Sequence, residues 1–94
     1  MKIGKLILEN PLFLAPMAGV TDKAFRMITK PFGPAMMYTE MVSGKGLHYK
    51  SQRTAQLLHA EEAEGPVAAQ IFGHEPEIMG SIAEEALRFG AVMV

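Results

Sequence analysis

Runs of apolar residues without polar alternation recur along the chain and predict buried strands. The first run covers residues 12–15 and is apolar throughout, and we expect further strands in the largely apolar segments 35–41 and 67–72. A continuous apolar run suits a strand that is covered on both faces, as in a parallel sheet. Residues 91–94 resume the pattern and predict the beginning of a fourth strand, and residues 2–8 predict two very short strands joined near a glycine.

A helical pattern follows the first apolar run. Residues 22–30 are predicted to form a helix, with Thr21 as its N-cap and Asp22 in its first turn, where a carboxylate complements the helix dipole. The apolar residues of this helix that we expect to face the core are Phe25, Met27 and Ile28.

The second half of the chain predicts two further helices. We expect a loop at 42–50, a short helix at 51–58 that Ser51 can cap, and an exposed acidic linker at 59–65. The last helix has Pro76 near its first turn and ends at a glycine. Its apolar stripe comprises Ile78, Met79, Ile82, Ala83, Ala86 and Leu87.

Strands and helices therefore alternate in the order βαβαβαβ, which predicts an α/β fold with parallel strands and right-handed crossovers. Such proteins bind their ligands at the carboxyl ends of the strands. The search for functional residues thus begins where each predicted strand ends.

Composition narrows the class of protein without identifying a partner. The 94 residues are 49% hydrophobic and 20% charged, with a net charge of −1. These values indicate one small globular domain at most, without an overall attraction to nucleic acid or membranes. There is no cysteine and no metal-ligand spacing among the three histidines, so we expect neither disulfides nor a metal site. We see no signal sequence and no membrane-length apolar run, and expect a soluble cytoplasmic protein.

Three strand ends carry the residues best suited to a ligand: Pro16-Met17-Ala18, Thr39-Glu40-Met41 and Gln70-Ile71-Phe72. The first is a slim turn, so a flat aromatic ligand can lie against its backbone. Gln70 offers amide donors and an acceptor, which suit an imide edge such as that of uracil or a flavin.

Structural roles are the alternatives at these positions. Met17 and Met41 are typical core residues by composition, and Gln70 can be a polar residue whose hydrogen bonds are satisfied within the fold. Glu40 is costly to bury beside methionines unless it is hydrogen-bonded or functional. The pattern alone leaves its role as a ligand residue open.

A small basic and aromatic cluster follows the second strand. It comprises Lys45, His48, Tyr49, Lys50 and Arg53. Interleaved bases and aromatics can meet a nucleic-acid backbone, and an ordinary solvated loop is the alternative. Lys45, Tyr49 and Arg53 are our candidates for the substrate side of a site.

Four motifs together resemble the tRNA-dihydrouridine synthases, and among them the bacterial B-type branch. They are APMAGVTD at 15–22, Phe25-Arg26, YTEMVS at 38–43 and QIFGHEPE at 70–77. They occur in the family's order, and the resemblance extends from about residue 3 to residue 94.

The resemblance implies an eight-stranded TIM (β/α)8 barrel that carries FMN, followed by a small helical domain. It implies reduction of the C5–C6 double bond of uridine in tRNA: NADPH reduces FMN, a hydride passes to C6, and a cysteine protonates C5. Family contacts to FMN fall at Pro16, Met17, Ala18 and Gln70, and Glu40 falls near the flavin and substrate side.

The chain departs from the family pattern at its end. The cysteine that acts as the acid in relatives is absent, so no catalytic residue is assigned within residues 1–94. We expect an N-terminal part of the FMN-binding barrel: three βα units and the start of a fourth strand, inactive and prone to self-association when isolated. The alternatives are a part of another FMN barrel, such as a dihydroorotate dehydrogenase or an old-yellow-enzyme relative, and a non-catalytic, self-associating α/β module.

Overall fold

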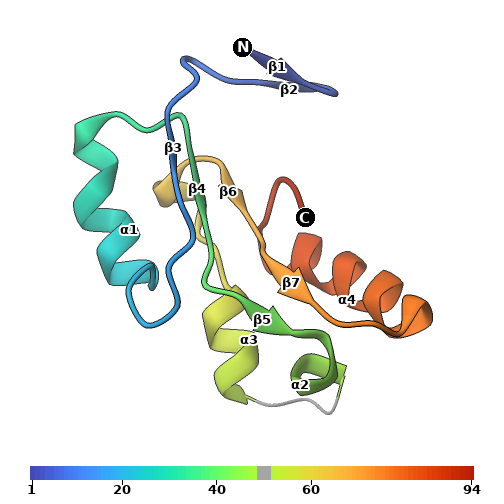
Figure 1. Ribbon diagram of the computed structural model, residues 1–94. Helices are drawn as coiled ribbons and strands as arrows, with labels where there is room; N and C mark the ends of the chain where they lie inside the picture. Colours follow the sequence, from blue (N-terminus) through green and yellow to red (C-terminus); the bar gives the residue numbers. More distant parts are fainter. Residues whose placement is uncertain (49–51) are drawn as a thin grey trace.

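The computed structural model describes residues 1–48 and 52–94 (Figure 1). The chain begins with an antiparallel hairpin of β1 (Lys2–Ile3) and β2 (Leu6–Ile7). Gly4 lies in its turn with a φ of 57°, a left-handed conformation that glycine adopts without strain. The two short strands predicted for residues 2–8 are thus confirmed.

A parallel sheet forms the centre of the molecule. Its strands are β3 (Phe13–Leu14), β4 (Met36–Tyr38) and β6 (Val67–Ala68), in the order β3-β4-β6. Met93 adds a parallel bridge to Ala68, so the last residues lie on the far side of β6. The predicted α/β class with parallel strands is confirmed.

The predicted strand 67–72 is interrupted, and the predicted strand 35–41 is shortened to β4. A second parallel pair, β5 (Val42–Ser43) and β7 (Ile71–Phe72), follows β4 and β6 after a break in each. The breaks fall at residues 39–41 and 69–70, which include Thr39-Glu40-Met41 and Gln70 of the strand ends that the sequence had singled out.

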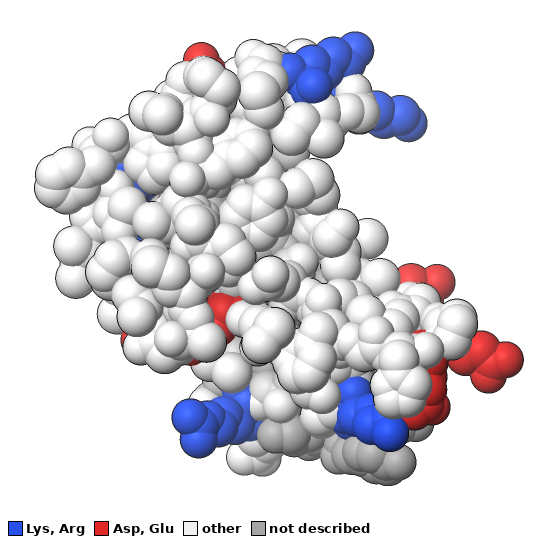
Figure 2. Space-filling model, in the orientation of Figure 1, with Lys and Arg blue, Asp and Glu red and all other residues white. Residues whose placement is uncertain are grey.

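The helices flank these strands, with α1 at one side and α4 at the other in Figure 1. The helical elements are α1 (Lys23–Thr29), η1 (Lys30–Phe32), α2 (Gly44–His48), α3 (Gln52–Leu58), η2 (Glu62–Glu64) and α4 (Pro76–Arg88). Figure 2 shows that uncharged atoms dominate the centre of the same face, while basic atoms gather at its two ends.

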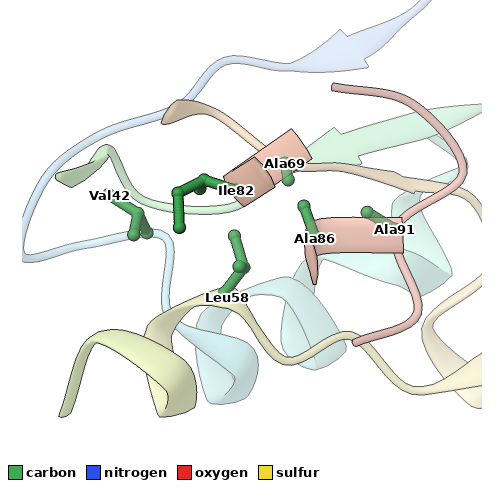
Figure 3. Close-up of a cluster of buried hydrophobic side chains, with 6 residues drawn as sticks. All are labelled: Val42, Leu58, Ala69, Ile82, Ala86 and Ala91. Atoms are coloured by element: carbon green, nitrogen blue, oxygen red, sulfur yellow. The ribbon is translucent and has the colours of Figure 1, made fainter. Parts of the chain in front are cut away.

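Two clusters of buried side chains make up the core. In the larger one, side chains from the strand ends, α3 and α4 point toward one another (Figure 3): Val42, Leu58, Ala69, Ile82, Ala86 and Ala91. The smaller one joins the hairpin to the central sheet through Leu8, Ala35, Met36 and Ala68. The stripe predicted on α4 supplies Ile82 and Ala86, but Leu87 is 53% exposed and does not belong to the core.

The predicted orientation of α1 is wrong. Phe25, Met27 and Ile28 are 36%, 39% and 69% exposed, and the only buried side chain of this helix belongs to Arg26. The helix is rotated toward a buried carboxylate, Glu64, with which Arg26 forms an ion pair. An ion pair that is satisfied inside the protein thus decides which face is buried, and the apolar side chains remain outside.

Three local predictions also need correction. The N-cap of α1 is Asp22, whose carboxylate accepts a hydrogen bond from the Phe25 N–H at 2.8 Å. The predicted loop 42–50 contains β5 and α2, because Val42 is buried and pairs with β7. The predicted exposed linker 59–65 contains η2, where Glu64 is buried. Ser51 lies outside the described residues.

Candidate functional site

The turn after β3 is closed by its own backbone and by Thr21. The carbonyl of Met17 accepts hydrogen bonds from the N–H groups of Val20 and Thr21, at 3.0 and 2.9 Å. The Thr21 hydroxyl accepts from the Met17 N–H at 3.0 Å and donates to the Met17 carbonyl at 3.2 Å. Thr21 is fully buried, so it fixes the shape of the turn from within instead of capping α1.

The outer side of this turn is open. Met17 is 39% exposed, and Ala18 and Gly19 are also exposed, so the interpretation of Met17 as a core residue is wrong. The Ala18 N–H donates to none of the described residues. Met41, at the next strand end, is 48% exposed and is not a core residue either. A slim backbone edge with a free donor therefore faces outward beside Pro16.

Glu40 is buried and holds the same turn. One of its carboxylate oxygens accepts a hydrogen bond from the Gly19 N–H at 2.5 Å, and the residue is only 8% exposed. This bond offsets part of the cost of burying the carboxylate. Every fully buried side-chain oxygen in the described part of the chain has a partner. The second oxygen of Glu40 has no such partner, so it must reach the surface.

Thr39 connects this strand end to the next one. Its hydroxyl accepts a hydrogen bond from the Gln70 N–H at 3.0 Å and donates to the Glu40 carbonyl at 2.9 Å. Thr39 is fully buried, whereas Gln70 is half-buried. The side-chain amide of Gln70 bonds to none of the described residues, so its donors and its acceptor are available to a ligand.

Hydrogen bonds therefore bring the three strand ends together, as the sequence pattern predicted for one edge of a parallel sheet. The first bond joins Gly19 to Glu40, and the second joins Thr39 to Gln70. We refer to this group of residues, Pro16–Gly19, Thr39, Glu40 and Gln70, as the strand-end cluster. It offers open backbone, a free amide and a partly accessible carboxylate.

Two further candidates, Lys45 and Arg53, lie on α2 and α3, outside the strand-end cluster. Lys45 on α2 forms an exposed ion pair with Glu75, with 3.1 Å between Nζ and Oε1. It borders a small pocket lined in part by Ser43, Gly44, Phe72, His74 and Met79. Arg53 is exposed on α3. Tyr49 lies outside the described residues.

Sequence patterns did not reveal the most extensive buried network of the chain. Arg26 donates from Nε to Glu64 at 2.7 Å, from Nη1 to the Thr21 carbonyl at 2.9 Å and from Nη2 to the His59 carbonyl at 3.1 Å. The other oxygen of Glu64 accepts from the Glu61 N–H at 2.6 Å. An arginine among the apolar residues of the predicted helix was the available signal for this network.

Glu61 lies at the exposed edge of that network. A hydrogen bond and an ion pair from Lys23 hold the pKa of the Glu61 carboxyl below its usual value. Within residues 1–48 and 52–94, no helix is long and apolar enough to cross a membrane. The same residues contain no group of three or more acidic, histidine or cysteine side chains arranged to hold a metal ion.

Open backbone and unpaired polar groups thus lie at the carboxyl ends of parallel strands, the edge of the sheet at which α/β proteins bind their ligands. The model of the Dihydrouridine synthase (Dus) family matches residues 13–94. The chain therefore belongs to this family. Membership decides against a dihydroorotate dehydrogenase or an old-yellow-enzyme relative, which the sequence pattern had left open.

Several curated relatives resemble the whole chain. It is 36% identical over 94 residues to tRNA-dihydrouridine synthase B of Vibrio vulnificus, covering 100% of this chain and 29% of the relative. It is 37% identical over 95 residues to the protein of the same name from Pasteurella multocida, covering 100% of this chain and 28% of that one. A probable tRNA-dihydrouridine synthase 1 of Synechocystis is 35% identical over 95 residues, 100% of this chain and 26% of the relative.

The chain thus spans less than a third of the length of these curated relatives. No solved structure was found to match it.

Proposed function

We propose that the chain is the N-terminal part of a flavin-dependent tRNA-dihydrouridine synthase. In this proposal it supplies three βα units and the start of the fourth strand of a TIM barrel. The full-length protein, of which these residues are a part, reduces the C5–C6 double bond of uridines in tRNA with FMN and NADPH, in the cytoplasm.

The observation that carries this proposal is the strand-end cluster, found in a chain that belongs to the Dus family. FMN presents a flat ring system with an imide edge, and it needs a slim surface and paired donors and acceptors. The open turn at Met17 and Ala18 supplies the slim surface, with a free N–H at Ala18. Gln70 supplies an amide without an internal partner. The residues present therefore fit the ring system of FMN.

Each residue has a distinct part in this proposal. The backbone of Pro16, Met17 and Ala18 would hold one side of FMN, and the Gln70 amide would bind its imide edge. When bound and reduced by NADPH, FMN supplies the hydride for the uracil ring. The chain holds no cysteine, so the acid of the family's reaction would come from outside these residues.

The substrate side of the site involves charged residues. The accessible oxygen of Glu40 lies beside the open turn and is a candidate contact for flavin or uracil N–H groups. Lys45 and Arg53 are exposed cations on α2 and α3, which suits contacts with tRNA phosphates. Tyr49, between them in the sequence, stays a proposed substrate-side residue.

The experiment is to purify the full-length protein, record its flavin absorption, and supply NADPH and unmodified tRNA. We expect bound FMN and dihydrouridine in the tRNA. The isolated 94-residue chain should form none, since general acid catalysis alone contributes about 10²–10⁴-fold and the acid is absent. A full-length protein that binds no flavin and forms no dihydrouridine would overturn the proposal.

A further inference from the structure

The two parallel ladders between the second and third strands do not share one register. Tyr38 pairs with Ala68, and after the break Val42 pairs with Ile71. Three residues lie between Tyr38 and Val42 on one strand, but only two lie between Ala68 and Ile71 on the other. The segment 39–41 therefore contains one residue more than its partner, which is the definition of a β-bulge.

Thr39 replaces a ladder hydrogen bond at this bulge. The Thr39 N–H donates to the Ala68 carbonyl at 2.9 Å, as in a regular parallel ladder. The next bond of such a ladder would run from the Gln70 N–H to the Thr39 carbonyl. Here the Gln70 N–H donates instead to the Thr39 hydroxyl, at 3.0 Å. The side chain of Thr39 thus determines where the backbone of Gln70 lies.

The bulge also presents Glu40 to the opposite side. The ladder resumes when the Val42 N–H donates to the Gln70 carbonyl at 2.9 Å, so Glu40 and Met41 are left out of it. The carboxylate of Glu40 is then free to accept the Gly19 N–H of the turn after β3. Two adjacent residues of one bulge therefore hold Gln70 on one side and the Pro16–Gly19 turn on the other.

We propose that Thr39 and Glu40 are positioning residues that set the separation between Gln70 and the Pro16–Gly19 turn. Thr39 acts through Gln70, because its hydroxyl holds the backbone from which that amide extends. Glu40 acts through the turn, because its carboxylate holds the Gly19 N–H. The inference rests on the proposed function, which supplies FMN as the planar ligand that lies between these two groups.

A double-mutant cycle in the full-length protein tests the part played by Thr39. Thr39→Val removes the hydroxyl and keeps the volume, so FMN binding should weaken about tenfold in the wild-type background. In the Gln70→Ala background the same change should weaken FMN binding by less than about twofold, since no side-chain amide remains to be positioned. Thr39→Ser keeps the hydroxyl and should restore wild-type binding.

Matched variants separate positioning from general stability. Thr29→Val removes a hydroxyl that donates to the Phe25 carbonyl on α1, and it should leave FMN binding within about twofold. Glu40→Leu removes the acceptor for Gly19 and should weaken binding about tenfold in both backgrounds, while Glu40→Gln recovers most of the loss. Hydrogen exchange of the backbone N–H of Gln70 should become faster in Thr39→Val but not in Thr29→Val.

An equal loss of FMN affinity from Thr39→Val in both backgrounds would overturn the role of Thr39, because a merely structural effect does not depend on the side-chain amide of Gln70. If Thr39→Val does not fold, Thr39→Ala takes its place in the cycle with the same expected result. Unchanged binding in Glu40→Leu would overturn the role of Glu40. Absence of FMN from the wild-type full-length protein is a different result, since it contradicts the proposed function itself.

Discussion

Arg26 and Glu64 lie 38 residues apart in the sequence and form a fully buried ion pair, with 2.7 Å between Nε and Oε1. The pair joins α1 to η2. The same guanidinium holds the carbonyl of Thr21, whose hydroxyl closes the turn at Met17. The ion pair therefore supports the strand-end cluster through Thr21, whereas Glu40 supports it through Gly19.

Removal of the carboxylate from this pair should destabilise the full-length protein strongly. Glu64→Ala leaves a buried guanidinium without its partner, and breaking such a pair costs about 3–5 kcal/mol of the free energy of unfolding. Glu62→Ala, at an exposed position of the same η2 turn, should cost less than about 0.5 kcal/mol. Urea unfolding of both variants measures the difference. Equal losses would show that the pair contributes little.

The carboxyl of Glu61 should titrate below the usual range in the folded protein. Lys23 stabilises its ionised form, chiefly through a hydrogen bond, so the folded pKa lies below the unfolded one. The resulting stabilisation is present above the unfolded pKa and is lost as the pH falls through the folded pKa. Titration of the Glu61 carboxyl by NMR measures this pKa, which should rise in Lys23→Met. An unchanged pKa in that variant would exclude Lys23 as the cause.

Two glycines at the C-terminal part of the chain should respond in opposite ways to alanine. Gly90 has a φ of 107°, and a Cβ there would lie 2.1 Å from the Ala60 carbonyl oxygen. Gly90→Ala should therefore lower the free energy of unfolding by about 1–3 kcal/mol. Gly80 lies within α4, and an added Cβ there would meet only open space. Gly80→Ala should therefore raise the free energy of unfolding by about 0.5–1 kcal/mol. Thermal unfolding that changes in the same direction for both would contradict this contrast.

Gln70 variants test the proposed flavin contact directly in the full-length protein. Gln70→Ala should weaken FMN binding by about 1–3 kcal/mol if a buried flavin group loses its partner. Gln70→Glu should weaken it further and lower the flavin midpoint potential, because a negative charge replaces amide donors beside the flavin carbonyls. Dissociation constants and potentials that agree among all three proteins would assign Gln70 a structural role.

The isolated 94-residue chain should self-associate. Among the strands of residues 1–48 and 52–94, β3 has a partner on one side only, and unpaired strand edges recruit further strands. Large apolar side chains nearby are also uncovered: Leu12, Ile28 and Phe32 are 63%, 69% and 83% exposed. Light scattering at micromolar concentration should show species larger than a monomer. A single sharp species at 10.2 kDa would contradict the prediction.

The sequence predicted the order and type of the elements, because continuous apolar runs and a helical stripe depend on local periodicity. It also predicted that Pro16–Ala18, Glu40 and Gln70 come together, because parallel strands place their carboxyl ends at one edge. The hydrogen bond between Glu40 and Gly19 could not be predicted from the sequence, because a single bond between two strand ends leaves no periodic signal.

The face of α1 was predicted wrongly for a related reason. Hydrophobicity assigned Phe25 and Ile28 to the core, but the partner of Arg26 lies in a segment that composition had assigned to an exposed linker. Long-range pairing of charges is invisible to local patterns. The early end of the second strand, before Thr39 and Glu40, was missed as well, because residues 35–41 contain no proline or glycine that would stop a strand.

The bulge at residues 39–41 makes the length of this segment as important as its chemistry. Loss of one residue there would leave two residues on each strand between the pairs Tyr38–Ala68 and Val42–Ile71, so the ladder could run through without interruption. The Thr39 hydroxyl would then no longer take the place of a backbone carbonyl for the Gln70 N–H, and Glu40 would lose the bulge that presents its carboxylate to Gly19. Deletions and insertions in this segment should therefore be tolerated far less than most substitutions, and an alignment gap there would mark a relative whose ligand edge is built differently.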